Sequence, residues 1–420
     1  MNRVVITGIG FATSIGVGKA EVLSSLREMR HGFSYRHLAG EGTGPGIVCG
    51  SVDGFDVEDD DSRFWNFPGA EELDPGFVRG LPPQGPYALV SVEEAMKQAG
   101  LSRDDLGNPA TGLFCASIGS PRNLRFHLNK MAAADWQRVD PKAVVSSIAG
   151  TLNFNLAAHY GITGANCSFV SACTSSSHAL GFAFDEIALG RQEIMIVVGA
   201  QDGNADDLLP FLGMRALSSN PDPSTASRPF DRHRDGFVPT GGGAALILES
   251  ESSATRRGGT PLAEMLGWGQ ASDGYHVAAP HPEGRGIRSA IERCLAATDV
   301  SANCIDWISA HATSTEAGDR AEASALRSLG YANGEGRTFI SSTKGLTGHG
   351  LSYSGVLEAA ICALSIREGI VPGNAALEDP DEAFDGLRLP TRTENHPLHL
   401  VLNNSSGFGG TNVCHLFSRP

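Results

Sequence analysis

Short apolar segments alternate with longer amphipathic segments along most of the chain, and this alternation is what most restricts its fold. The predicted strands are short, mainly apolar runs at residues 4–7, 112–116, 168–172, 194–199, 244–248, 307–310, 339–342 and 400–403. The predicted helices repeat apolar residues at helical spacing, at residues 19–28, 88–99, 175–189, 286–297, 317–329 and 355–367. Such alternation is typical of α/β proteins with mainly parallel sheets.

The chain contains one internal break that suggests two parts. Ser, Arg and Gly cluster at residues 251–259, and strand–helix alternation continues on both sides of this cluster. We therefore predict an N-terminal half at residues 1–255 and a C-terminal half at residues 256–420. Residues 36–86 are rich in Gly, Pro and acidic side chains, and we interpret them as surface loops and a cap.

The charge balance limits the kinds of partner. The 420-residue chain has 32 Lys and Arg against 47 Asp and Glu, so its formal charge is 32 − 47 = −15. This excess of negative charge argues against nucleic-acid binding, which requires a basic face. A dinucleotide site is not expected either, because Thr13 replaces the third glycine after Gly8 and Gly10.

The cysteines and the apolar segments predict a cytoplasmic protein. Eight cysteines are scattered without a C-x-x-C pair or zinc spacing, which indicates reduced thiols rather than disulfides. The first residues enter a predicted strand and do not resemble a signal peptide. No run of about 18 apolar residues is present, so we expect no membrane span.

Cys173 lies where a predicted strand meets a predicted helix, within Ser171-Ala172-Cys173-Thr174-Ser175-Ser176. The start of a helix offers unpaired backbone N–H groups and the positive end of the helix dipole. Both favour the thiolate, which is the nucleophilic form of cysteine, and the same amides can hold a negative oxygen beside the sulfur. A buried structural cysteine is the alternative interpretation.

Two histidines and a lysine follow later strands in a similar way. His311 comes directly after one predicted strand and is flanked by small residues, and His349 lies in a glycine-rich turn after the next. Either histidine alone is more often structural than catalytic. Lys344 precedes His349 and Glu358 follows it, and the simplest interpretation of these two charges is a solvated ion pair of little energetic value.

A glycine-rich turn near the C-terminus completes the pattern. Gly407, Gly409 and Gly410 surround Phe408, so that backbone amides can face a ligand, although an ordinary tight turn would also explain the glycines. Active sites of open α/β sheets gather at strand ends, where all these features are predicted to lie. A thiolate and two imidazoles suit acyl transfer, because the thiolate takes an acyl group from a thioester and imidazole N–H groups stabilise an enolate.

The chain resembles the β-ketoacyl-acyl-carrier-protein synthases of the thiolase-like superfamily, in particular the elongating type I and type II class. The resemblance extends from residues 4–10 to residues 407–412 and includes the segments 226–231 and 234–238. The order Cys, His, His is specific to this class, because the initiating class has Asn where His349 stands. The resemblance implies an α/β fold, a thiolase-like five-layered αβαβα sandwich made of two related halves.

The resemblance also implies a role for each candidate catalytic residue. Cys173 accepts the acyl group. His311 and His349 promote decarboxylation of a malonyl thioester and hold the resulting enolate, and Lys344 orders the region of His311 with Glu358 as its partner. The carbanion then attacks the acyl thioester and extends a fatty acid or polyketide chain by two carbons.

The substrates implied by the resemblance arrive on an acyl carrier protein through its 4′-phosphopantetheine arm. Thr313 and Thr315 would hydrogen-bond this arm, the amides of Cys173 and Phe408 would form the oxyanion hole, and the Phe408 ring would gate the acyl pocket. No metal, nicotinamide or other resident cofactor is expected. The expected partners are acyl- and malonyl-carrier protein and, in a dimer, either a second copy or a related ketosynthase-like subunit.

Several residues depart from the family pattern. Thr240-Gly241-Gly242 stands where Gly-Glu-Gly is frequent, and Ser352-Tyr353-Ser354-Gly355 stands where Gly-Ala-Ala-Gly is frequent. Ala312 replaces a Gly, Ser406 replaces a Phe, and little basic charge beyond Arg79 precedes the helix that would dock the carrier protein. These changes leave the chemistry intact and suggest a specialised type II pathway, such as polyketide or polyene assembly.

Two other functions remain open. A thiolase would need a second reactive cysteine in a glycine-rich turn near the C-terminus, and Cys414 lies just beyond that turn. A non-catalytic chain-length partner of a ketosynthase heterodimer would lack the nucleophile, whereas Cys173, His311 and His349 are all present. The length, branching and unsaturation of the acyl chain do not follow from the sequence.

Overall fold

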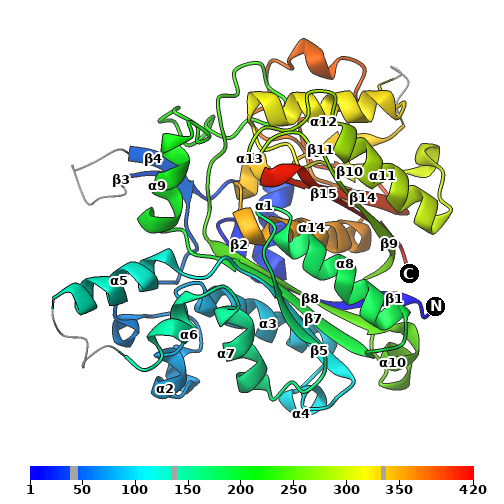
Figure 1. Ribbon diagram of the computed structural model, residues 1–420. Coiled ribbons are helices and arrows are strands. Elements are labelled where there is room, and N and C mark those ends of the chain that lie inside the picture. Colours follow the sequence, from blue (N-terminus) through cyan, green and yellow to red (C-terminus); the bar gives the residue numbers. More distant parts are fainter. Residues whose placement is uncertain (38–45, 134–139, 333–336) are drawn as a thin grey trace.

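The computed structural model describes residues 1–37, 46–133, 140–332 and 337–420. Most of the described strands belong to one eleven-stranded sheet (Figure 1). From one edge to the other, its main path runs through β11 (Phe339–Ser341), β10 (Trp307–Ser309), β14 (Leu400–Gly407), β15 (Thr411–Ser418), β9 (Ala263–Ser272), β1 (Val4–Thr13), β8 (Gly242–Ser250), β7 (Ile194–Gln201), β5 (Thr111–Ala116) and β6 (Asn166–Phe169).

The two halves of this sheet repeat one strand order. From the outer edge of the sheet to its middle, the N-terminal half has the order β6, β5, β7, β8, β1, and the C-terminal half has the order β11, β10, β14, β15, β9. In each half these are the third, second, fourth, fifth and first of its five strands along the chain. In both halves the second strand pairs parallel with the third and fourth, and the other pairs are antiparallel. β1 and β9 join the halves over residues 4–6 and 263–265. The predicted fold of two related halves is confirmed, whereas the boundary at residues 255 and 256 stays a prediction.

Helices complete the five layers (Figure 1). The central helices α8 (Ser175–Ala188) and α14 (Ser354–Glu368) lie between the two halves of the sheet and contact strands of both. α3 (Gly85–Ala99) and α7 (Thr151–Tyr160) cover the outer face of the N-terminal half, and α11 (Arg285–Thr298), with α12 (Glu316–Ser328) beside it, covers the C-terminal half. The largest hydrophobic cluster fills the middle layers, with Leu180 of α8 and Val356 of α14 among its members.

Glycines in the first strand of each half let an outer helix approach the sheet closely. A Cβ atom at Gly8 would lie 2.1 Å from the carbonyl oxygen of Ala95 in α3, and one at Gly10 would lie 1.8 Å from that of Ser91. Gly269 in β9 is confined in the same way by α11. The glycines near the N-terminus therefore serve helix–sheet packing.

The two central helices cross at a contact that only a glycine allows. A Cβ atom on Gly355 of α14 would lie 1.9 Å from Oγ of Ser177 in α8. The same Ser177 hydroxyl donates to Oγ of Ser405 in β14, 2.8 Å away. The N-terminal ends of α8 and α14 are thereby held close together in the middle of the molecule.

Some elements differ from the sequence-based prediction. The strand predicted at residues 168–172 is β6 at Asn166–Phe169, and Val170 beyond its end is 56% exposed, because β6 is an edge strand with one neighbour, β5, among the described strands. The segment predicted as loops contains β4 (Gly46–Gly50), paired with β3 (Phe33–His37), and buries Trp65 and Phe67 in the core. Residues 38–45 of that segment lie outside the described residues.

Several short elements complete the description. α9 (Ala205–Gly213) and α13 (Lys344–Thr347) contribute residues to the site described below, whereas α5 (Pro121–Ala132) and α6 (Ala143–Ser147) line a separate cavity. The others are β2 (Gly16–Val17), α1 (Lys19–Glu28), α2 (Pro75–Val78), α4 (Arg103–Leu106), α10 (Glu251–Arg256), β12 (Ile370–Val371) and β13 (Glu394–Asn395). Among the described helices, none has both the length and the apolar character needed to cross a membrane.

Candidate active site

Cys173 lies in a tight turn between β6 and α8, as predicted. Ala172 has a left-handed backbone conformation with φ = 53°. The carbonyl oxygen of Ser171 accepts hydrogen bonds from the backbone N–H of Thr174, at 3.2 Å, and from its hydroxyl, at 2.7 Å. This turn holds Cys173 at the start of α8, where its side chain is almost fully buried, with 9% of the residue exposed.

His349 lies against the sulfur of Cys173. Its Nε2 atom is 3.1 Å from Sγ of Cys173, and its Nδ1 atom is 2.9 Å from Oγ of Ser354. His349 is buried and lies in the chain between α13 and α14. The imidazole therefore precedes the central helix α14, just as the thiol of Cys173 precedes the central helix α8. A thiol and an imidazole in hydrogen-bond contact form a nucleophile–base pair.

His311 lies beside His349 at the end of β10. The two rings are nearly perpendicular, with 5.4 Å between their centroids. The backbone N–H groups of His311 and Ala312 donate to the carboxylate of Glu322 in α12, at 2.9 and 2.7 Å, and Nδ2 of Asn404 donates to the same carboxylate at 2.6 Å. Glu322 and Asn404 therefore hold the loop of His311 in place, a role that sequence reasoning missed.

Lys344 and Glu358 form an ion pair inside the protein. Their side chains are only 1% and 2% exposed, so the alternative of a solvated surface pair is wrong. Burial raises the pKa of the Glu358 carboxyl to about 7, although the positive charge of Lys344 acts in the opposite direction. The positive charge of Lys344 also lowers the pKa of His311 and of His349.

Two opposing influences act on the thiol of Cys173. Burial raises its pKa to about 12, against the opposing influence of Lys344 and of the backbone N–H groups of Cys173 and Phe408. The helix start thus favours the thiolate, as expected from the sequence, but loss of hydration acts more strongly in the opposite direction. Burial also lowers the pKa of His349 well below its ordinary value, so its imidazole is neutral at pH 7 and free to accept the thiol proton.

The turn that carries Phe408 closes over Cys173. A Cβ atom on Gly407 would lie 3.2 Å from the backbone nitrogen of Cys173, and Gly409 has φ = 81°, so both positions suit glycine. The backbone N–H groups of Cys173 and Phe408 both oppose the rise in the pKa of the Cys173 thiol. Two such N–H groups beside one sulfur are suited to form an oxyanion hole.

An apolar cluster borders the nucleophile. Besides Cys173 it contains Ile47, Cys49, Leu208, Leu217, Phe237 and Leu351. The half-buried Phe408 continues this surface, because its ring centroid lies 6.3 Å from that of Phe211, which contacts Phe237 in turn. An acyl chain attached to Cys173 would find apolar side chains on this side of the sulfur.

Thr313 and Thr315 lie between His311 and α12. Their hydroxyl oxygens are 3.0 Å apart, Thr313 is buried and Thr315 is half-buried. Arg234 packs against the start of α12, which follows the two threonines. Its guanidinium lies 3.7 Å from the Asp319 carboxylate of α12 and donates to the Asp381 carboxylate at 3.0 Å. The segment 234–238, which resembles a family motif, thus supports the loop that carries both threonines.

Cys414 is not placed as a second nucleophile. It lies within β15, not in the glycine-rich turn, and its side chain is buried in the apolar cluster that includes Cys294. Burial raises its pKa well above the ordinary value for a thiol. The arrangement that a thiolase would require at this cysteine is therefore absent.

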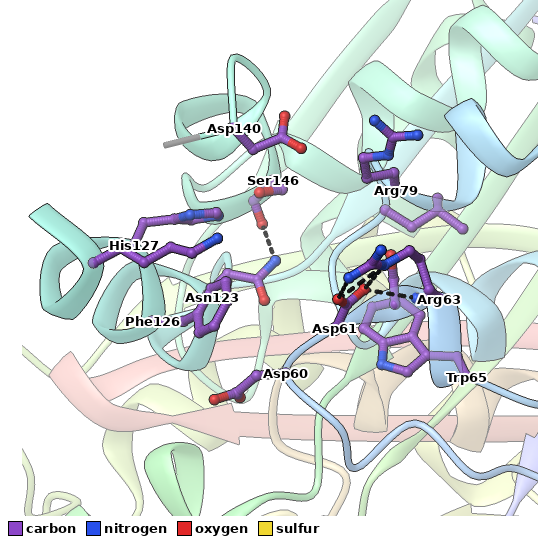
Figure 2. Close-up of a pocket in the computed structure, with 13 residues that line it drawn as sticks. Asp60, Asp61, Arg63, Trp65, Arg79, Asn123, Phe126, His127, Asp140 and Ser146 are labelled. Atoms are coloured by element: carbon purple, nitrogen blue, oxygen red, sulfur yellow. Dashed lines mark hydrogen bonds and ion pairs between the residues drawn. The ribbon is translucent and has the colours of Figure 1, made fainter. Parts of the chain in front are cut away.

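A separate cavity of about 310 Å³ lies between the η1 turn (Ser62–Phe64), α5 and α6 (Figure 2). The labelled side chains include both acids and bases, and the guanidinium of Arg63 is hydrogen-bonded to Asp61. None of the residues predicted to act in catalysis lines this cavity. The chemistry described above belongs to the enclosed space around Cys173 instead.

Comparisons with known proteins show the family of the chain. Residues 1–254 match the family model for the β-ketoacyl synthase N-terminal domain, and residues 262–378 match the model for the C-terminal domain. The 3-oxoacyl-[acyl-carrier-protein] synthase 1 of Haemophilus influenzae is 35% identical over 430 residues, covering 100% of this chain and 99% of that protein. The synthase 1 of Escherichia coli K12 is 35% identical over 418 residues, covering 98% of each.

Solved structures show the same fold. The ishigamide ketosynthase/chain length factor structure has a TM-score of 0.87 and 28% identity, covering 100% of this chain and 99% of that chain. A β-ketoacyl synthase from Burkholderia phymatum has a TM-score of 0.87 and 28% identity, covering 100% of both chains. From the family models, these relatives and the repeated five-layered fold, we conclude that the chain belongs to the β-ketoacyl synthase family of enzymes.

Proposed function

We propose that the chain joins an acyl group held on Cys173 to a malonyl unit held on an acyl carrier protein, with loss of CO₂. The observation that carries this proposal is the 3.1 Å contact between Sγ of Cys173 and Nε2 of His349, with the amides of Cys173 and Phe408 beside the sulfur. This set of groups suits acyl transfer to a thiol and stabilisation of the charge that develops next to it.

The first step of the proposed reaction is acyl transfer. Because the thiol has a raised pKa, its proton passes to Nε2 of the neutral His349 as Sγ attacks the carbonyl carbon of the acyl thioester. The amides of Cys173 and Phe408 hold the oxyanion of the tetrahedral intermediate. The carrier thiolate leaves and takes up the proton, which yields the acyl-Cys173 thioester and the free carrier thiol.

The second step is decarboxylation and condensation. The C–C bond to the malonyl carboxylate breaks, CO₂ leaves, and the electron pair forms an enolate whose oxygen accepts hydrogen bonds from the imidazoles of His311 and His349. The enolate carbon then attacks the acyl carbonyl carbon, and the Cys173 thiolate leaves and takes up one proton. The product is a 3-oxoacyl chain on the carrier, longer by two carbons.

The buried charges support this assignment of roles. Burial, aided by the positive charge of Lys344, lowers the pKa of both His311 and His349, so their N–H groups can donate without carrying a formal charge. The Glu358 carboxylate offsets that charge within the protein interior. In the proposed complex, Thr313 and Thr315 hydrogen-bond the phosphopantetheine arm, which arrives with the carrier, and the reaction draws on no resident cofactor.

We further propose that the pathway is a specialised type II pathway. The departures from the family pattern at residues 240–242 and 352–355 motivate this proposal. The two segments pack together: the Tyr353 hydroxyl donates to the carbonyl oxygen of Gly241 at 3.1 Å, and a Cβ atom on Gly242 would lie 2.9 Å from the Tyr353 hydroxyl oxygen. Tyr353 is fully buried, so it replaces the usual small residue without loss of packing.

The edge of the sheet supports a dimer. β6 has one strand neighbour among the described residues, and Val170 and Phe182 near it are 56% and 39% exposed. A second copy or a related ketosynthase-like subunit would cover this apolar edge. The eight cysteines are all free thiols, which supports a cytoplasmic location for the reaction.

Mass spectrometry of the protein incubated with a panel of acyl-carrier-protein thioesters tests the proposed function. We expect one acyl mass increment for the preferred chain, and none for Cys173→Ala, because the alanine removes the accepting sulfur. Malonyl-carrier protein should then yield CO₂ and a 3-oxoacyl product. Full acylation of Cys173→Ala would show that another group accepts the chain, and absence of any acylation of the unmodified protein would contradict the function.

A further inference from the structure

We propose that Ser354 is a positioning residue that lets His349 work both as a proton acceptor and as a hydrogen-bond donor at Nε2. Ser354 is the first residue of α14, and its Oγ lies 2.9 Å from Nδ1 of His349. Within the described part of the chain, this hydroxyl has no other hydrogen-bond partner. The inference rests on the proposed function, because that function gives His349 two different tasks.

The two tasks require opposite protonation patterns of the ring. When Nε2 accepts the thiol proton of Cys173, the ring becomes a cation and Nδ1 carries a hydrogen that needs an acceptor. When Nε2–H donates to the enolate oxygen, the neutral ring leaves Nδ1 as an acceptor that needs a donor. A serine hydroxyl can accept in the first case and donate in the second, because it carries one hydrogen and two lone pairs.

Burial makes this partner important. His349 is 3% exposed and Ser354 is 2% exposed, so water is not available to replace a missing hydrogen bond at Nδ1. An unsatisfied buried nitrogen would disfavour whichever tautomer exposes it. A backbone amide in the same place would donate only, and would support one of the two tasks at the expense of the other.

The position of the hydroxyl is secured by its neighbours. Tyr353, fully buried and hydrogen-bonded to the carbonyl of Gly241, fixes the turn before α14. Gly355, on the other side, packs against Ser177 of α8. The departures from the family pattern at residues 353 and 354 therefore act together: the tyrosine packs the turn, and the serine directs its hydroxyl at the catalytic imidazole.

Ser354→Ala tests the inference, and alanine suits this helix position. We expect kcat to fall about tenfold in both half-reactions, acyl transfer to Cys173 and decarboxylation of malonyl-carrier protein, with KM changed by less than about twofold, because one hydrogen bond to a charged or polarised ring is lost. Ser352→Ala is the matched control, since that hydroxyl is also buried but donates to Oε1 of Gln201 at 2.8 Å.

A second readout does not depend on the natural substrates. Alkylation of Cys173 by iodoacetamide, followed across pH, reports how readily the thiol gives its proton to His349. We expect Ser354→Ala to slow alkylation about tenfold at pH 7 and to move the profile to higher pH, because the imidazolium loses its acceptor. Ser352→Ala should reproduce the profile of the unmodified protein.

The outcomes separate the inference from the proposed function. If Ser354→Ala matches the unmodified protein in both half-reactions and in the alkylation profile, Ser354 does not position His349. If only one half-reaction slows, the hydroxyl supports one tautomer and the two-task proposal is wrong. If the unmodified protein neither acylates nor decarboxylates, the proposed function fails, while the alkylation profile still decides whether Ser354 acts on the Cys173–His349 pair.

Discussion

The two halves of the sheet share one strand order but carry different chemistry at equivalent strand ends. In each half the third strand leads towards a central helix: β6 leads to α8 with Cys173 before it, and β11 leads to α14 with His349 before it. Because both helices begin in the same middle layer, the thiol and the imidazole meet at 3.1 Å. A repeated scaffold thus brings two unlike side chains to one point.

The second and fourth strands of the two halves are also followed by different side chains. β10 is followed by His311, whereas β5 is followed by Ser117, whose hydroxyl accepts a hydrogen bond from the Gln84 side chain at 2.7 Å. The short turn after β14 presents the Phe408 amide, whereas the long connection after β7 supplies α9 and apolar side chains. The N-terminal half contributes the thiol of Cys173 and apolar side chains beside it, and the C-terminal half contributes the imidazoles of His311 and His349.

The prediction with the largest expected effect compares substitutions of the two histidines that the C-terminal half contributes. We expect His349→Ala to slow acyl transfer and decarboxylation each by about 10³-fold, because the ring contacts the sulfur and also faces the enolate. His311→Ala should slow decarboxylation by about 10²-fold and acyl transfer by less than about tenfold. Rapid-quench mass spectrometry of each half-reaction measures both. Equal loss of acyl transfer in the two variants would show that the histidines are not divided in this way.

The buried ion pair of the C-terminal half provides the next test. Glu358→Gln leaves the Lys344 charge buried without its partner, so we expect the free energy of unfolding to fall by about 3 kcal/mol. Glu368→Gln is the control on the same helix, because Glu368 pairs with half-exposed Lys19 and Arg27 and should cost less than about 1 kcal/mol. Urea unfolding measures both changes, and equal values would contradict the assignment of a special role to the buried pair.

The N-terminal half contains the buried carboxyl groups of Asp202 and Asp207, and we expect the smallest of the predicted effects from substituting one of them. Burial, together with the charge of Asp202, raises the pKa of Asp207 to about 8, so the folded chain keeps a proton that the unfolded chain loses above about pH 4. Stability from this group is therefore lost as pH rises from about 4 to 8. Asp207→Asn should reduce that loss by about 1 kcal/mol or more, measured by urea unfolding at pH 5 and pH 8. An unchanged pH dependence would contradict it.

Much of the fold follows from local patterns. Predicted helix 19–28 has the bounds of α1, and the predicted strands at residues 4, 194, 307, 339 and 400 begin where the structure begins them. β9 was missed, because Gly267 and Gly269 interrupt its apolar run in favour of close packing with α11. β15 was missed because the buried polar side chains Asn412 and His415 obscure its pattern.

Local sequence patterns also predict the site only in part. The sequence indicated Cys173, His311 and His349 through their places at strand ends, but not the contacts that join distant segments. Asn404 reaches Glu322 across 82 positions of the chain, and no local pattern marks that bond. The pKa of Cys173 shows a related limit: helix position is visible in the sequence, whereas burial of the sulfur, which raises that pKa, depends on the whole fold.

The crossing of α8 and α14 at Gly355 has a consequence for how activity responds to gentle denaturation. The separation of Sγ and Nε2 is determined by two helix ends, which the Gly355–Ser177 contact and the 3.0 Å hydrogen bond from the Val356 N–H to Oγ of Ser176 hold together. A small increase in the distance between the helices would separate thiol from imidazole while both halves of the sheet keep their hydrogen bonds. Warming or low urea should therefore stop turnover before the far-ultraviolet circular dichroism changes, so that loss of catalysis precedes loss of secondary structure.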